Sequence, residues 1–226
     1  MLAIIQARVS SKRFPDKVLK KINKQTVLEQ VINQANAVFP LKKIIVATSR
    51  GKKDLKICKI CKKKGVKYFR GDLNNVSKRF YNILNKYNSK SFIRICADSP
   101  FLDPILVKKF IKIFKRNELD FITNVLPRTF PRGQSIEIFN SDIYKSNFKK
   151  IRKASDLEHV TTFFYSNKKK FKYLNIKNRK NFSDISMCID YPDQLLNAKN
   201  IFQKNKIRKT FKNWKKYITY FKRIKY

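Results

Sequence analysis

The fold is decided at the start of the chain, by residues 2–19, LAIIQARVSSKRFPDKVL. The apolar run from Leu2 to Ile5 predicts a buried strand, and a helical pattern begins at Thr26. The loop between them carries the cations Arg8, Lys12, Arg13 and Lys17. In an open α/β sheet, such a loop lies at the carboxyl end of a central strand, where backbone amides, hydroxyls and fixed cations can hold a triphosphate. The stretch therefore predicts an anion site.

The same loop also fits a plainer interpretation, a solvated basic turn in a very basic protein. It lacks the glycines and the Gly-Lys-Ser/Thr ending of a Walker loop. Its spacing alone does not distinguish the two interpretations, so the rest of the chain has to decide.

Length and composition indicate a globular protein. A chain of 226 residues with 42% hydrophobic content fits one α/β domain that is large enough for a real core. No apolar run is long enough to span a bilayer, and the chain begins with a strand rather than a signal peptide, so we expect a cytoplasmic location.

The formal net charge of +39 raises a rival hypothesis, a basic RNA-binding protein. The lysines, however, are scattered through every predicted element rather than gathered into one arm or tail. General basicity is therefore weak evidence for specific nucleic-acid binding, although it would attract anionic substrates.

Cys58 and Cys61 form a C-x-x-C pair inside a predicted helix at 54–64, and no second pair accompanies it. Buried thiols explain this pair better than a zinc or redox site does. Four cysteines in this arrangement agree with a reducing cytosol.

Strand and helix patterns alternate along the chain. Thr26 and Glu29 form a capping box at the start of the first helix. Strands are predicted at 2–5, 43–48, 66–69, 92–97, 119–123, 171–176 and 185–189, with an alternating strand that ends at Phe139. Helices are predicted at 26–35, 54–64 and 74–85, and after Pro104 and Pro192. This order predicts an α/β fold with a mostly parallel central sheet.

Two carboxylates follow predicted strands. Asp98 and Asp190 each come directly after an apolar run, so they could meet across the crevice at the carboxyl ends of the strands. Hard divalent cations take oxygen ligands and usually combine one or two carboxylates with substrate phosphates. Asp103 and Asp193 are better explained by the helix starts that follow them.

A rigid, doubly basic loop at 127–136 interrupts the regular order. Arg128 and Arg132 in this loop could clamp a carboxylate in a bidentate manner. The only histidine, His159, has no nucleophile beside it in the sequence, and a lone histidine is more often structural than catalytic.

The order of these motifs resembles one family, the cytidylyltransferases that make CMP-activated sugar acids. These are the acylneuraminate and Kdo enzymes and their spore-coat-polysaccharide relatives. Residues 6–17 resemble the family's first motif, which is Gln/Pro-Ala-Arg, a small residue and Ser, followed by Arg-Leu-Pro-Gly-Lys. Residues 98–104 resemble the motif Asp-x-Pro-hydrophobic-hydrophobic-x-Pro. Residues 189–195 resemble the motif Ile/Val-Asp-Thr-Pro-Glu-Asp-Leu. The chain departs from the family at Ser10, Asp16, Gln134, Ser135, Tyr191 and Gln194.

The resemblance implies a Rossmann-like, three-layer α/β/α fold of the nucleotide-diphospho-sugar transferase type. It covers residues 1–207, and the remaining residues 208–226 are expected to form a basic amphipathic helix packed on or extending the domain. The implied reaction moves CMP from CTP to a sugar-acid hydroxyl with release of pyrophosphate, depends on Mg²⁺, and serves surface polysaccharide or glycan biosynthesis. A degenerate relative that binds nucleotide without turnover remains an alternative, and a homodimer is expected by analogy.

The resemblance also implies roles for individual residues. Catalysis falls to Arg8, Lys17, Asp98 and Asp190, of which Asp98 and Asp190 would bind the metal. The nucleotide would lie against Ala7, Arg8, Ser11, Arg13, Lys17, Arg70 and Gly71. The sugar would face Arg128, Arg132, Glu137 and His159.

Overall fold

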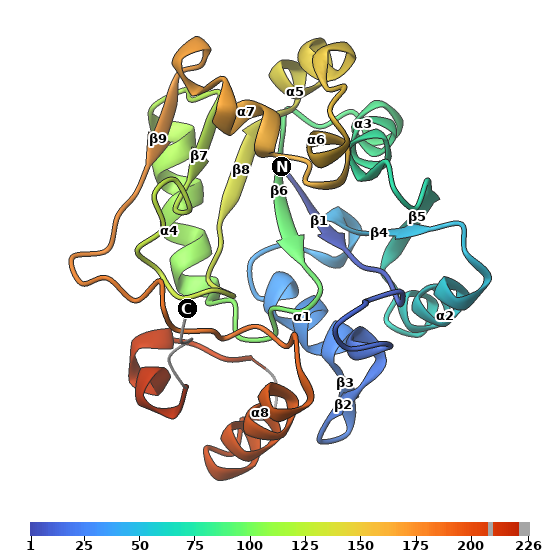
Figure 1. Ribbon diagram of the computed structural model, residues 1–226, viewed down its shortest axis with the longest axis vertical. Coiled ribbons are helices and arrows are strands. Elements are labelled where there is room, and N and C mark those ends of the chain that lie inside the picture. The colour runs from blue at the N-terminus through green and yellow to red at the C-terminus, as the bar shows by residue number, and fades with distance from the viewer. Residues whose placement is uncertain (208–209, 222–226) are drawn as a thin grey trace.

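The computed structural model of the chain describes residues 1–207 and 210–221 (Figure 1). Its centre is a seven-stranded sheet with the strand order β5-β4-β1-β6-β8-β7-β9. The strands are β1 (Leu2–Gln6), β4 (Ile44–Ser49), β5 (Lys67–Gly71), β6 (Ser91–Cys96), β7 (Phe121–Thr123), β8 (Glu137–Asn140) and β9 (Tyr173–Asn175). Only β8 runs against its neighbours, β6 and β7, and the other pairings are parallel. The predicted α/β class and mostly parallel sheet are confirmed.

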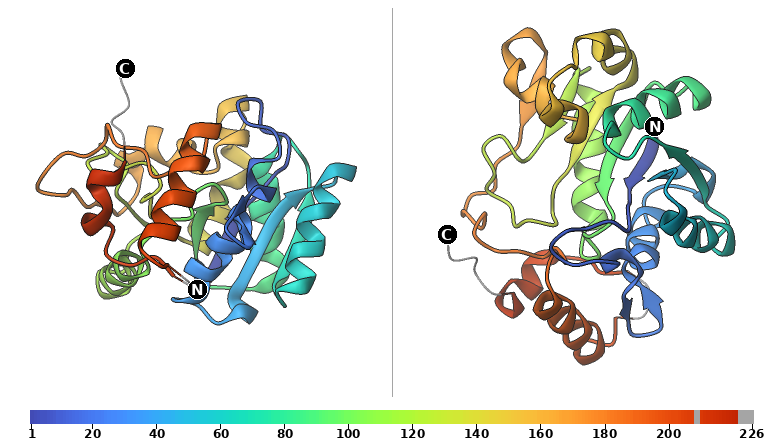
Figure 2. Two further views of the ribbon diagram at one scale, coloured as in Figure 1. Left: turned by 90° about the horizontal axis from the view of Figure 1, so that it is seen from below. Right: turned by 45° about the vertical axis from the view of Figure 1, so that its right-hand side comes forward.

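Helices cover both faces of this sheet, as the two views of Figure 2 show. They are α1 (Val27–Asn36), α2 (Leu55–Lys63), α3 (Val76–Tyr87), α4 (Pro104–Arg116), α5 (Ser141–Asn147), α6 (Ala154–Glu158), α7 (Thr162–Ser166) and α8 (Pro192–Lys204). A small hairpin, β2 (Lys21–Ile22) with β3 (Gln25–Thr26), precedes α1. The predicted capping box is present, because Glu29 N–H donates to Thr26 Oγ1 and Thr26 N–H donates to Glu29 Oε2.

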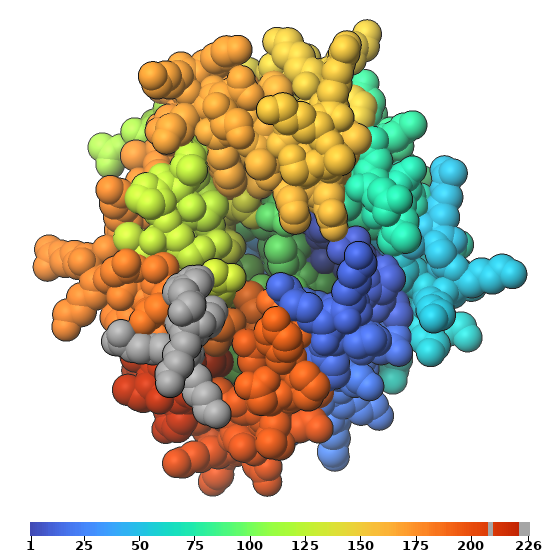
Figure 3. All heavy atoms as spheres, in the orientation of Figure 1, coloured from blue at the N-terminus to red at the C-terminus, as the bar shows by residue number. Residues whose placement is uncertain are grey.

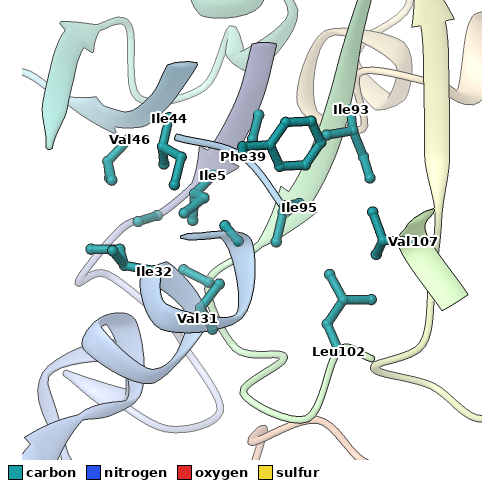
Figure 4. Close-up of a cluster of buried hydrophobic side chains, with 14 of the residues drawn as sticks. Ile5, Val31, Ile32, Phe39, Ile44, Val46, Ile93, Ile95, Leu102 and Val107 are labelled. Carbon is teal, nitrogen blue, oxygen red and sulfur yellow. The ribbon is translucent and has the colours of Figure 1, made fainter. Parts of the chain in front are cut away.

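Alternation along the strands divides the core into two faces. On one face, β1 contributes Ala3 and Ile5 to a cluster that packs against α1, α2 and α4. Figure 4 shows part of this cluster, with Ile5, Val46 and Ile95 directed toward Val31 and Ile32 of α1. On the other face, Leu2, Ile4, Phe92, Phe121 and Phe139 pack beneath α3, α5 and α7. Side chains alternate between the two faces of a sheet along each strand. The residues two positions after Ile4 and Phe92 therefore also lie on this second face.

A third apolar cluster joins α8 to the end of the chain. Phe211, Trp214 and Phe221 are buried against residues that include Phe101 and Phe202. The described part of the tail contains a 3₁₀ helix at Trp214–Tyr220 instead of a long amphipathic helix. The rest of the predicted tail helix, residues 208–209 and 222–226, lies outside the described residues. Among the described residues, no helix is long and apolar enough to cross a membrane.

The prediction of a strand at 185–189 is wrong. This segment forms only an isolated bridge, in which Arg132 N–H donates to Ile185 C=O at 2.9 Å and Met187 N–H donates to Arg132 C=O at 2.8 Å. The physical reason is that β6, the strand next to it, is already paired on both sides by β1 and β8. The segment therefore crosses the carboxyl end of β6, where Ile189 N–H donates to Asp98 C=O at 2.8 Å.

Gly133 makes this crossing possible. Its φ of +90° lies in the left-handed region, and a Cβ there would lie 2.8 Å from the carbonyl carbon of Met187 and 2.9 Å from its oxygen. Gly65 also has a positive φ, +65°, but a Cβ there would meet nothing within 4 Å.

We predict that Gly133→Ala lowers the free energy of unfolding by about 2–4 kcal/mol, since backbone strain and a methyl group pressed on a main chain both contribute. Gly65→Ala is the matched control, and its loss should be only about 1 kcal/mol, because it adds strain without a clash. Equilibrium denaturation of both variants measures the difference. Equal losses would show that the contact with Met187 is unimportant.

Candidate active site

A single lysine joins the two predicted carboxylates. Lys17 Nζ lies 2.6 Å from Asp98 Oδ2 and 2.7 Å from Asp190 Oδ1. Arg13 Nη2 lies 2.7 Å from the same oxygen of Asp190. The side chain of Lys17 is only 10% exposed, so these charges are weakly screened. The first loop, the end of β6 and the segment before α8 thus meet at one point.

These contacts set the protonation of the cluster. Burial lowers the pKa of Lys17, but the two carboxylates outweigh it, so its pKa is raised. Burial raises the pKa of Asp190, but hydrogen bonds and charges from Lys17 and Arg13 outweigh it, so its pKa is lowered below 3.8. The site therefore holds its cation and Asp190 fully ionised at neutral pH.

Backbone turns place each carboxylate. β6 ends at Cys96, and Ser99 N–H donates to Cys96 C=O at 3.2 Å, which turns Asp98 toward the first loop. Asp190 N–H donates to Gln194 Oε1 at 2.7 Å, and Pro192 opens α8, as its position in the sequence predicted. The departure at Gln194 thus supplies the acceptor that holds the backbone at Asp190.

The first loop is held by a carboxylate that the sequence did not single out. Asp54, buried at the start of α2, accepts a hydrogen bond from Val9 N–H at 2.8 Å and another from Ser49 N–H at 3.1 Å. The departure at Asp16 also fits this loop, because its φ of +58° is a left-handed conformation that aspartate tolerates better than most residues. The backbone there adopts the conformation that a glycine would favour.

Above the Lys17 cluster lies a pocket of about 740 Å³. Figure 3 shows it as a central hollow between the blue first loop, the yellow segment around α6 and the orange segment before α8. Its wall includes Arg8, Ser11, Arg13, Lys17, Asp98 and Glu158. Across it, Arg8 Nη2 lies 3.0 Å from Glu158 Oε1. The structure thus brings the predicted first-loop residues and Asp98 around one cavity.

A buried polar network forms the floor of this pocket. Arg94 of β6 donates from Nε to Gln6 Oε1 at 3.1 Å and from Nη1 to Glu137 Oε2. Glu137 Oε1 also accepts from Thr161 Oγ1, at 2.8 Å, and from the hydroxyl of Tyr165. Burial raises the pKa of Glu137, but Arg94 and the two hydroxyls outweigh it, so its pKa is lowered. Glu137 was predicted to face the sugar, whereas the structure places it behind Arg94 with its carboxylate occupied.

Sequence reasoning missed Arg94, although a signal was present. An arginine between Ile93 and Ile95 breaks an otherwise apolar strand, and a charge there needs a buried partner. Its partners on β1 and β8 could not be read from the sequence, because they depend on how the strands pair.

Other predicted residues lie elsewhere. Arg70 donates to the carbonyl oxygens of Ser49 and Arg50, and it does not line the pocket. Gly71 is buried against Arg79, whose Cγ would lie 2.4 Å from an added Cβ. Ala7 is also buried, and its N–H donates to Ala47 C=O.

The residues predicted to face the sugar are not among those that line the 740 Å³ pocket. Arg128 Nη1 donates to Ser135 Oγ at 3.0 Å, and burial lowers its pKa. The main chain of Arg132 binds the crossing segment, while its side chain is exposed. His159 is exposed and ends α6, with its N–H donated to Ser155 C=O at 2.8 Å.

Asp98 and Asp190 are the residues suited to a divalent cation. Two carboxylates that reach the same ammonium are close enough to share one ion, and their oxygens are the donors that Mg²⁺ prefers. In the described part of the chain, no cluster of three or more His, Cys, Asp or Glu residues is suited to a metal. A cation held here would complete its ligands with water or substrate oxygens.

The lowered pKa of Asp190 makes a prediction about stability. Its ion pairs stabilise the fold fully above about pH 5, and this contribution is lost as the pH falls through 3.8 toward the lower folded pKa. Asp190→Asn should therefore flatten the fall in the free energy of unfolding over this range. Urea denaturation at a series of pH values measures the slopes, and parallel curves would contradict the assignment.

Comparison with known proteins agrees with this geometry. Residues 2–217 match the family model described as cytidylyltransferase. The spore coat polysaccharide biosynthesis protein SpsF of Bacillus subtilis is 26% identical over 90% of this chain and 87% of that protein. The 3-deoxy-manno-octulosonate cytidylyltransferase of Solibacter usitatus is 31% identical over 47% of this chain and 42% of that protein. The solved cytidylyltransferase of Leptospira borgpetersenii superposes with a TM-score of 0.85 at 27% identity, over 90% of this chain and 86% of that one. The chain belongs to the cytidylyltransferase family.

Proposed function

We propose that this protein transfers CMP from CTP to a hydroxyl group of a sugar acid, with release of pyrophosphate, in the synthesis of a surface polysaccharide or glycan. The observation that carries the proposal is the Lys17 cluster, in which two carboxylates and a basic loop meet at the edge of a 740 Å³ pocket. Carboxylates beside a phosphate site repel the substrate unless a metal intervenes, so this arrangement favours metal-assisted phosphoryl chemistry over simple anion binding.

In this proposal the first loop binds the triphosphate. Arg8, Arg13 and Lys17 neutralise its charge, and Ser11 donates a hydrogen bond to it. Arg8 is held by Glu158 through an ion pair that is about 40% exposed on each side, so a triphosphate can replace Glu158 at small cost. The scattered surface lysines, with a net charge of +39, draw anionic substrates toward the pocket.

Asp98 and Asp190 hold Mg²⁺ in the proposed enzyme. The ion, when bound, supplies a positive charge against the α-phosphate and the incoming oxygen. Lys17 keeps both carboxylates aligned before substrate arrives. Catalysis of this kind depends on positioning and charge neutralisation, and it requires no covalent nucleophile from the protein.

The first test is pyrophosphate release with Mg²⁺ and each of the four nucleoside triphosphates, against a panel of sugar acids that includes N-acetylneuraminate and Kdo. We expect release only with CTP and one acid. CTP that raises the melting temperature without any turnover would indicate the degenerate relative. Salt-sensitive RNA binding without a CTP effect would support the rival function.

The two carboxylates can be tested one at a time. Asp98→Asn and Asp190→Asn should each lower the rate of Mg²⁺-dependent turnover by about 10³-fold, since each removes one ligand charge at the reacting centre. The matched control is Asp142→Asn, because Asp142 lies on α5 with its side chain 76% exposed. Full activity of either site variant would remove that residue from the mechanism.

We propose that the protein works in the cytoplasm as a homodimer. Sedimentation at several protein concentrations tests the dimer.

A further inference from the structure

Arg94 is an unexpected residue at its position in the sheet. β6 is flanked by β1 and β8 (Figure 1). The register places Arg94 opposite Ile4 on one side and Glu137 on the other. Two residues on the same face belong to the apolar core: Phe92, which is two positions before Arg94 on β6, and Phe139, which is two positions after Glu137 on β8. The side chains of Arg94 and Glu137 are only 14% and 5% exposed.

Stability does not explain this pair. Replacing a buried ion pair by apolar residues of similar size is often neutral or stabilising, because desolvation offsets the attraction between the charges. The pair instead holds Arg94 in one orientation, with Gln6 on its Nε and Glu137 on its Nη1. Glu137 is itself fixed by Thr161 and Tyr165.

One nitrogen of Arg94 is left for a ligand. Nη2 has no hydrogen-bond partner within residues 1–207 and 210–221, and it is not among the buried atoms that lack a partner. Arg94 also lines the pocket that contains Lys17 and Asp98. A rigid guanidinium that presents a free N–H edge to a pocket is suited to bind an anionic oxygen.

The position of Arg94 separates it from the triphosphate loop. Arg94 and Cys96 share one face of β6, because side chains alternate along a strand, and both line the pocket together with Asp98. Arg94 lies on the β8 side of the pocket, whereas the first loop follows β1. Arg128 also lies on that side, because its Nη1 donates to Ser135 Oγ, two residues before Glu137 at the start of β8. This second cation keeps the region positive although Glu137 neutralises Arg94.

We propose that Arg94 binds the carboxylate of the acceptor sugar acid, with Glu137 and Gln6 as positioning residues. The inference rests on the proposed function and assigns the acid group of the substrate to one side chain. It also explains why a charged pair is kept in the core: an apolar replacement would leave the sheet intact and the acceptor unrecognised.

The test compares acids with their neutral methyl esters. N-acetylneuraminate, Kdo and the two esters are titrated calorimetrically into the protein loaded with Mg²⁺ and a non-hydrolysable CTP analogue. We expect the natural chain to bind at least one acid on the order of 10- to 100-fold more tightly than its ester, which is the effect of one charged hydrogen bond.

The decisive variant is Arg94→Met combined with Glu137→Gln, which avoids an unpaired buried charge. It should bind acid and ester equally while its affinity for the CTP analogue is unchanged. Arg116→Met, which removes an exposed arginine at the end of α4, is the matched control and should keep the preference for the acid.

Two results would overturn the inference while leaving the CTP reaction in place: a natural chain without preference for the acid, or a double variant that keeps this preference. Failure of the natural chain to bind the CTP analogue would overturn the proposed function, and the inference with it. The nucleotide titration thus distinguishes the two failures.

Discussion

The ammonium group of Lys17 is the contact on which the site depends. It bridges carboxylates that lie 81 and 173 residues away in the chain, at the end of β6 and just before α8. Two partly buried carboxylates that face one another would repel. Without this cation, the repulsion would oppose the contact between the crossing segment and Asp98. The first loop, in turn, is anchored by Asp54. A few charged contacts thus assemble a cavity from segments that share no local structure.

Much of the fold could be predicted because it depends on local patterns. The apolar run at the start of the chain, the Thr26 capping box and Pro104 at the start of α4 all act through near neighbours, and the structure confirms each. The convergence of Asp98 and Asp190 could also be predicted, since both follow apolar runs that end at the same edge of the molecule. Lys17 was predicted to bind the triphosphate, but its position between the two carboxylates was not predicted.

The remaining features depend on which strands are neighbours. The segment at 185–189 has the composition of a strand, yet the sheet offers it no free edge beside β6. Glu137 has the position of a pocket residue, yet the antiparallel register of β8 places it directly beside Arg94. Arg70 lies in β5, two places from β1, and its guanidinium donates to the carbonyl groups of Ser49 and Arg50 at the end of β4. Pairing across the sheet decides all three, and no local pattern encodes it.

The anchoring of the first loop by Asp54 has a consequence for ligand affinity. When a flexible loop becomes ordered on ligand binding, the entropy lost by the loop reduces the net binding free energy. The backbone of this loop is already fixed when the protein folds. The carboxylate that fixes it lies at the first turn of α2, outside the cavity. A substitution that disrupts this turn would therefore weaken ligand binding, although every residue that contacts the ligand is unchanged.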